Sequence, residues 1–149
     1  MPTAAPRALI TRPEPEASHW VQALQARGIA AAALPLICIA GAPDPQALAG
    51  AQQGLGDYDA VMVVSGSAAR HFFDSNEALA LIQQANTAIK TRVWAPGPGT
   101  AAMLQALGVP ANRIDQPAAD AGQFDSESLW RSVGASVRPG HRVLIVRGG

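Results

Sequence analysis

Residues 58–68 read Tyr-Asp-Ala-Val-Met-Val-Val-Ser-Gly-Ser-Ala. The apolar run at 61–64 is rich in β-branched side chains and has no polar alternation, which is typical of a parallel strand buried on both faces. A polar turn, Ser65-Gly66-Ser67, follows, and a helix is expected from Ala68, with Ser67 as its cap. This stretch predicts one strand–turn–helix unit of an α/β protein.

The same order of elements extends to both sides of this stretch. Strands are predicted at 8–11, 92–95, 112–115 and 141–146, and within the apolar run 29–39, where Pro35 marks a kink or the exit of the strand. Helices are predicted at 17–24, 46–54, 76–85, 101–107 and 124–133. The cap of the last helix is expected to be Asp125 or Ser126. Alternating strands and helices predict an α/β fold with a parallel sheet and right-handed crossovers. We expect Trp20 and Trp94 to fill core space and Cys38 to be a buried thiol.

Composition narrows the range of functions. The 149 residues hold 11 Lys+Arg and 11 Asp+Glu, so the chain lacks the basic excess of nucleic-acid binders and any long-range field for an anionic ligand. One cysteine excludes an internal disulfide, and the three scattered histidines, His19, His71 and His141, have no metal-ligand spacing. Neither a signal peptide nor a transmembrane run is evident, which predicts a cytoplasmic protein.

Polar turns follow several predicted strands, at the sheet edge where α/β proteins bind ligands. Residues 97–102 read Gly-Pro-Gly-Thr-Ala-Ala and formally match the dinucleotide fingerprint. Pro98, however, removes one backbone N–H that would hold a phosphate, and no acidic residue closes a clear following strand. Arg12 and Arg147 each follow a strand, where an arginine either binds a carboxylate bidentately or is simply a solvated charge. From the residues alone, a non-enzymatic small-anion-binding or regulatory module and a nucleotide-dependent enzyme both stay open.

Five segments, in order along the chain, resemble the uroporphyrinogen-III synthase family. They are residues 8–13 with 34–36, residues 58–68, residues 94–108, the run Phe-Asp-Ser-Glu-Ser-Leu at 124–129, and the run Gly-His-Arg-Val-Leu-Ile-Val-Arg-Gly-Gly at 140–149. The chain departs from the family pattern at Ser67, where the family has Asn, and at Ala69 and Pro96, where it has Val.

The resemblance implies a two-domain fold of flavodoxin-like, doubly wound parallel sheets, of which this chain is an incomplete N-terminal portion. Residues 1–36 are then a strand–helix–strand segment that would complete a first domain with a missing C-terminal half. Residues 37–149 are a second α/β domain that lacks its last elements. The full enzyme is expected to be a monomer, whereas exposed sheet edges favour dimerisation of this shorter chain.

The resemblance also implies an activity. Family members are cofactor-free lyases that cyclise hydroxymethylbilane to uroporphyrinogen III, with loss of water and inversion of ring D, in tetrapyrrole and haem biosynthesis. The resemblance also suggests hydroxymethylbilane synthase as a protein that the enzyme contacts. No residue is assigned as catalytic and no metal is expected. By motif position, the substrate-binding residues are Thr11, Arg12, Ser65, Gly66, Ser67, Ala68, Gly97, Thr100, Ser126, Arg147 and Gly148. Because the family tyrosine proposed to assist loss of the hydroxyl is absent, the chain alone is expected to be inactive.

Overall fold

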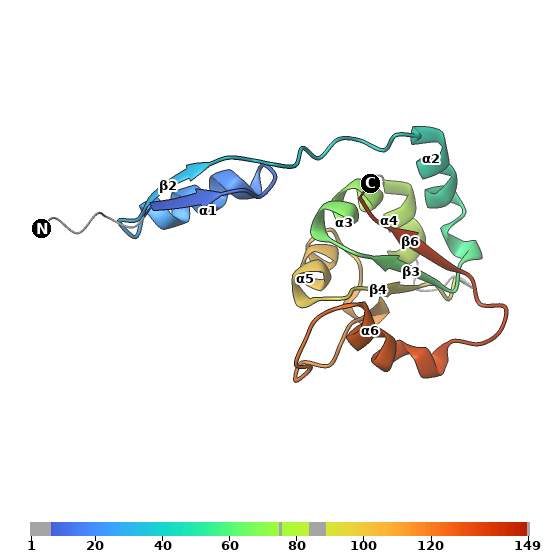
Figure 1. Cartoon of the computed structure of the whole chain (residues 1–149). Coiled ribbons are helices and arrows are strands. Elements are labelled where there is room, and N and C mark those ends of the chain that lie inside the picture. Colours follow the sequence, from blue (N-terminus) through green and yellow to red (C-terminus); the bar gives the residue numbers. More distant parts are fainter. Residues whose placement is uncertain (1–6, 75, 84–88, 149) are drawn as a thin grey trace, which may run out of the picture. The chain divides into compact units, whose positions relative to one another are not determined.

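The computed structural model describes residues 7–74, 76–83 and 89–148. The chain divides into two compact units, Met1–Gly41 and Ala42–Gly149, shown in Figure 1. Each unit is described by itself below.

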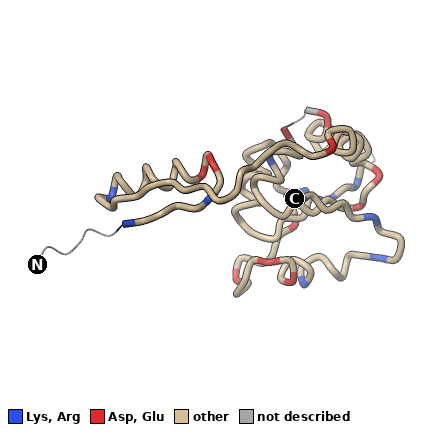
Figure 2. The backbone as a smooth tube through the Cα atoms, turned by 45° about the horizontal axis from the view of Figure 1, so that its top comes forward, with Lys and Arg blue, Asp and Glu red and all other residues tan. Residues whose placement is uncertain are grey.

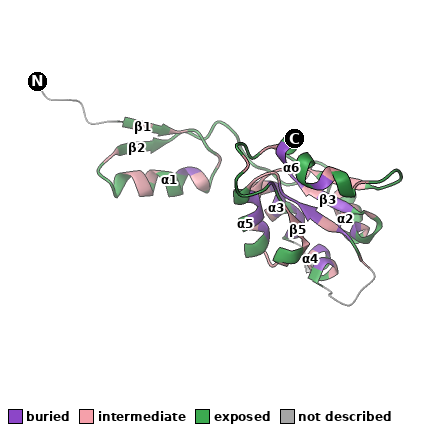
Figure 3. Cartoon of the chain, turned by 90° about the horizontal axis from the view of Figure 1, so that it is seen from below, coloured by how far each residue is buried: buried purple, intermediate pink, exposed green. Residues whose placement is uncertain are grey.

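The first unit is a single strand–helix–strand motif. Strand β1 (Arg7–Ile10) pairs in parallel with β2 (Ala30–Ala33), and helix α1 (Glu16–Gln25) connects them. Gly28, at φ 75°, turns the chain between α1 and β2. Ala17 is the only buried residue among those described in this unit, which Figure 3 shows almost wholly as exposed or half-buried.

Two sequence predictions for the first unit are wrong: Cys38 is exposed, and Trp20 is 46% exposed and fills no core. One helix and two strands offer too little surface to enclose these side chains. The second strand ends at Ala33, two residues before Pro35, which agrees with the expected exit at the proline and leaves residues 34–39 outside the strand.

The second unit is built on a four-stranded parallel sheet in the order β5-β4-β3-β6. Counted along this unit, the order is 3-2-1-4, as in doubly wound sheets, and the predicted α/β class is confirmed. Its elements are α2 (Pro45–Gln53), β3 (Ala60–Val63), α3 (Gly66–Phe73), α4 (Asn76–Gln83), β4 (Arg92–Trp94), α5 (Pro98–Ala106), β5 (Ile114–Asp115), α6 (Ser126–Val133) and β6 (Val143–Val146). Short 3₁₀ turns lie at Leu55–Asp57, Ala111–Arg113 and Gly134–Ser136.

Side chains alternate between the two faces of this sheet, so each face has its own core. On the first face, Val61, Val63 and Val93 pack with residues of α3, α4 and α5, including Phe72 and Leu104. On the second face a smaller cluster contains Ala60, Trp94, Leu129 and Val133, the last two from α6. The burial predicted for Trp94 is confirmed, at 7% exposure.

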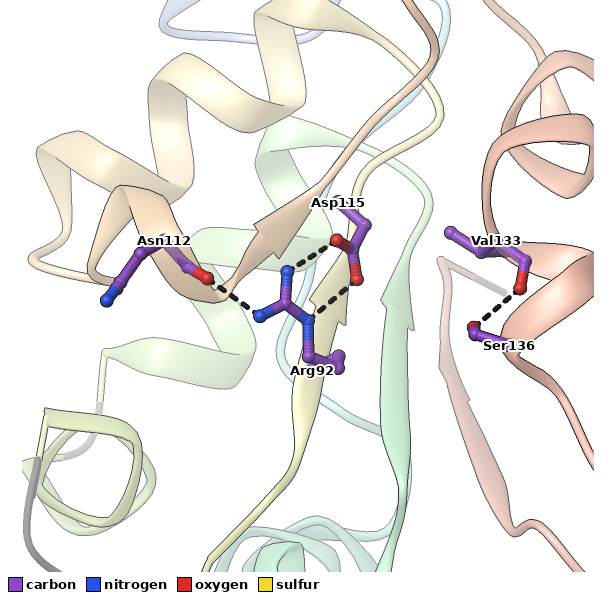
Figure 4. A network of polar contacts seen from close by, with 5 residues as sticks. All are labelled: Arg92, Asn112, Asp115, Val133 and Ser136. Carbon is purple, nitrogen blue, oxygen red and sulfur yellow. Dashed lines mark hydrogen bonds and ion pairs between the residues drawn. The ribbon is translucent and has the colours of Figure 1, made fainter.

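An ion pair joins β4 to the short edge strand β5. Arg92 Nε donates to Asp115 Oδ2 at 2.9 Å, Arg92 Nη2 donates to Asp115 Oδ1, and Arg92 Nη1 donates to the Asn112 carbonyl at 2.7 Å (Figure 4). The hydrogen bonds to Asp115 raise the pKa of Arg92. Because β5 contains only two residues, this side-chain network is a substantial part of what holds it in place.

Candidate functional site

The predicted site residues of the second unit gather at the carboxyl edge of its sheet. Residues 65–68 follow β3, residues 97–100 follow β4, and residues 147–148 follow β6. Helix α6 returns the chain from β5 to β6, so residues 124–126 at its start also lie at this edge. We call these four segments the rim. The rim places Ser65 to Ala68, Gly97, Thr100, Ser126, Arg147 and Gly148 on one side of the unit.

Neighbouring rim segments lie close together. The amide of Val64 donates to the Val146 carbonyl at 3.2 Å, so the turns after β3 and β6 leave the sheet side by side. A Cβ built on Gly66 would lie 3.7 Å from Met103, which shows how closely α3 and α5 approach. A Cβ on Gly97 would lie 3.6 Å from Phe124, so the turn after β4 adjoins the start of α6.

Two of the three rim helices use their own side chains as caps. Ser65 Oγ accepts from the Ala68 amide at 3.1 Å, so Ser65, and not Ser67 as predicted, caps α3. The reason is that the helix begins at Gly66, two residues earlier than expected, and Ser67 therefore lies in its first turn. Asp125 caps α6 by accepting from the Ser128 amide at 2.8 Å.

The start of α5 has no side-chain cap. Gly97 is its N-cap and Pro98 its first residue, so the missing proline N–H is one that the helix would leave unpaired anyway. The amides of Gly99 and Thr100 follow at the positive end of the helix dipole. Thr100 itself is nine-tenths buried. This helix start is suited to a carboxylate or another anionic group.

The start of α6 has the opposite electrostatic character. The pKa of Asp125 is lowered, mainly by the backbone hydrogen bond from Ser128 and secondly by the Ser128 hydroxyl. An ionised carboxylate therefore occupies the position that an incoming anion would need, and Ser126 directly follows it. Ser126 is consequently the predicted residue least suited to hold a carboxylate.

The two predicted arginines differ in their partners. Arg147 is exposed, and no carboxylate among residues 7–74, 76–83 and 89–148 lies within ion-pair distance of it. Arg12 lies in the first unit, after β1, and its Nε is 3.0 Å from Glu16 Oε2. Thr11 precedes it, and its carbonyl accepts from the Leu36 amide at 3.4 Å.

Charges of both signs are spread along the chain, as Figure 2 shows. A bound anion must therefore be held by local groups, as the composition predicted. In the part of the chain that the structure describes, no group of three or more His, Cys, Asp or Glu is placed to hold a metal ion. No described helix is long and apolar enough to cross a membrane.

Sequence reasoning missed an apolar groove on the second face of the sheet. A hollow of about 510 Å³ lies between the sheet and α6, lined by Met62, Trp94, Ser126, Glu127, Leu129, Trp130, Arg131 and Val133. These side chains meet only in the fold, because alternate side chains of β3 and β4 point to the face of the sheet on which α6 lies. Phe124 was also missed as a rim residue: it is 47% exposed beside Gly97. Its one sequence signal is an aromatic residue directly before a helix cap.

Comparison with known proteins decides the family. The family model described as uroporphyrinogen-III synthase HemD matches residues 18–149. The chain belongs to the uroporphyrinogen-III synthase family. The match includes the whole rim and the groove, whereas Thr11 and Arg12 precede it.

One solved member of the uroporphyrinogen-III synthase family resembles this chain. It is the crystal structure of uroporphyrinogen III synthase from the extremely thermophilic bacterium Thermus thermophilus, with 16% sequence identity and a TM-score of 0.48. The likeness covers 97% of this chain and 52% of that one, so the chain spans about half the length of this solved structure. No curated protein matches the sequence significantly.

Proposed function

We propose that the chain supplies a substrate-binding unit for the uroporphyrinogen-III synthase reaction, the dehydrating cyclisation of hydroxymethylbilane with inversion of ring D. The observation that carries the proposal is the family match over residues 18–149, which includes the complete rim. Two groups suited to carboxylates lie on that rim, the uncapped start of α5 and the exposed Arg147. The substrate is a linear, highly carboxylated tetrapyrrole.

The rim suits a reaction that depends on control of conformation. Hydroxymethylbilane loses its hydroxyl readily, and the enzyme must then direct the far ring to attack at its substituted carbon. Backbone amides and an arginine that hold the substrate's carboxylates restrict the chain of rings to the productive arrangement. In this proposal the chain works without a cofactor, in the cytoplasm, and receives its substrate from hydroxymethylbilane synthase.

We further propose that residues 1–36 contribute to a first domain that this chain does not complete by itself. In the first unit Leu9 is 58% exposed, and Leu36 and Ile37 are 69% and 64% exposed. Apolar side chains at this exposure normally contact another layer of structure. The 149-residue chain alone should therefore bind substrate at its rim without accelerating ring inversion.

Two measurements test the proposal. Hydroxymethylbilane is generated in situ with hydroxymethylbilane synthase, and the products are oxidised and separated as type I and type III porphyrins. With the 149-residue chain present, the non-inverted isomer should still accumulate at the spontaneous rate. Formation of the type III isomer above the level seen without the chain would refute the expectation that the chain alone is inactive.

Binding is tested separately with uroporphyrin as the probe. Arg147→Ala should weaken binding about five-fold, which corresponds to roughly 1 kcal/mol for an exposed charge contact. The matched control is Arg138→Ala, which removes an exposed positive charge before β6, at the other end of that strand. Equal effects of the two variants would refute a site at the rim.

A further inference from the structure

Phe124 is a large apolar side chain at the rim. It is 47% exposed, and neither hydrophobic core of the second unit includes it. The next residue, Asp125, accepts from the Ser128 amide as the cap of α6, so its carboxylate is held by the helix. A single exposed apolar residue is ordinary on a protein surface, and its neighbours therefore decide what Phe124 can do.

The turn after β4 lies directly beside Phe124. A Cβ built on Gly97 would lie 3.6 Å from the Phe124 Cβ, which is an ordinary van der Waals distance. Pro98 and Gly99, at the start of α5, are exposed, and a Cβ built on Gly99 would meet no atom within 4 Å. The helix start that lacks a side-chain cap and the exposed aromatic residue are therefore neighbours on one open part of the rim.

A buried hydroxyl belongs to the same helix start. Thr100, in the first turn of α5, is nine-tenths buried, and its hydroxyl forms no hydrogen bond with any residue that the structure describes. A buried polar group without a partner costs free energy, and a ligand oxygen at this helix start would supply one. The start of α5 thus offers a hydroxyl as well as the amides of its first turn.

We propose that Phe124 is a substrate-binding residue whose ring stacks on one pyrrole ring of the substrate, while a carboxylate arm of the same pyrrole binds the start of α5. The inference rests on the proposed function, because it takes the ligand to be a carboxylated tetrapyrrole. The flat, apolar faces of a pyrrole suit stacking on a phenyl ring, and its acetate and propionate arms suit free amides.

Stacking supplies what the amides cannot. A carboxylate arm rotates about its single bonds, so contacts to the arm leave the plane of the pyrrole free. Phe124 fixes that plane, and a reaction that depends on the orientation of its rings requires such control. The ionised Asp125 beside Phe124 repels a second carboxylate at this place but does not repel an uncharged ring.

The test titrates uroporphyrin, whose rings carry the same carboxylate arms, into the 149-residue chain and its variants. Phe124→Ala should weaken binding about ten-fold, through the loss of one aromatic contact and its apolar burial. Phe124→Tyr, which keeps the flat ring, should bind within about two-fold of the wild type. The matched control is Trp130→Ala, which removes an aromatic residue at 57% exposure that lines the groove and not the rim, and it should leave binding unchanged.

Two further measurements separate stacking from a packing role before the helix cap. Phe124→Leu keeps an apolar side chain that can pack against α6 but has no flat face, so it should retain the melting temperature and weaken uroporphyrin binding about five-fold. In the unsubstituted chain, the ring current of bound uroporphyrin should move the aromatic proton signals of Phe124 in the NMR spectrum. This second measurement stands even if Phe124→Ala fails to fold.

The inference is overturned if Phe124→Leu binds as tightly as the wild type, if Trp130→Ala weakens binding as much as Phe124→Ala, or if the Phe124 signals do not move. Its failure is distinguishable from that of the proposed function. Binding that depends on Arg147 and not on Arg138, yet is unchanged in Phe124→Ala, leaves the rim as the binding site and refutes the stacking alone.

Discussion

The Arg92–Asp115 pair offers the sharpest test of how the sheet edge is held. Arg92→Met removes the guanidinium but keeps a long side chain against the sheet. The variant loses the two hydrogen bonds to Asp115 and the one to the Asn112 carbonyl. It also leaves the Asp115 carboxylate, 29% exposed, without its charged partner.

The expected loss follows from the exposure of the pair. Arg92 is 41% exposed, so solvent screens the pair, and its coupling energy should be about 1 kcal/mol despite the bidentate geometry. The Asn112 carbonyl and the Asp115 carboxylate lose their hydrogen-bond donors, which adds about 1 kcal/mol to the loss of stability. For a unit of this size, a total of about 2 kcal/mol lowers the melting temperature by roughly 8 °C.

A double-mutant cycle with Arg92→Met and Asp115→Asn measures the coupling by urea denaturation. Hydrogen exchange of the Ala95 amide, which donates to the Asp115 carbonyl at 2.9 Å, reports locally on β5. In Arg92→Met, exchange of the Ala95 amide should accelerate more than exchange of the β3 amides. A coupling energy within about 0.3 kcal/mol of zero, or equal acceleration across the whole sheet, would refute the view that this pair fixes the edge strand.

Two further predictions concern the rim helices. Leu104→Ala in α5 should cost about 3 kcal/mol in urea denaturation, because Leu104 is fully buried, whereas Ile145→Ala in the same unit should cost less than about 1 kcal/mol. Asp125→Asn should remove a pH-dependent contribution to stability. Because the folded pKa of Asp125 is lowered, its contribution is present above about pH 4 and disappears as the pH falls through the folded value. The stability difference between wild type and Asp125→Asn should therefore shrink between about pH 7 and pH 2.5, and a constant difference would contradict the contribution of the ionised carboxylate.

The regular part of the fold was predictable because it repeats one local pattern. In the run at 61–64, Val61 and Val63 are buried against the first-face core, whereas Met62 and Val64 are half-buried, so the burial expected on both faces is complete on one face only. The turns after β3 and β4 were predicted from glycine and serine residues that terminate apolar runs. The start of α3 was missed by two residues because Ser65 and Ser67, which can both cap a helix, lie two positions apart, and only the backbone geometry selects one.

The exposed apolar residues were not predictable, because hydrophobicity reports what a side chain prefers and not what surrounds it. Residues 34–39 and Trp20 have core-like composition, yet the first unit has no second layer to cover them. The groove was missed for a related reason. It combines Met62 and Trp94 with residues of α6 that are more than thirty positions away from Trp94 in the sequence, and no local pattern links them.

The two rim groups suited to anions, the start of α5 and Arg147, follow strands that are not neighbours in the sheet, and this separation bears on the size of the ligand. The start of α5 follows β4 and Arg147 follows β6, and β3 lies between these strands. Adjacent strands lie about 4.8 Å apart, so the two groups leave the sheet roughly 10 Å from each other. Each group can hold a carboxylate of its own, whereas Asp125 disfavours a third anion at the start of α6. Two separate groups suit an extended ligand with several carboxylates, and the loss of Arg147 should therefore weaken the binding of a porphyrin without abolishing it.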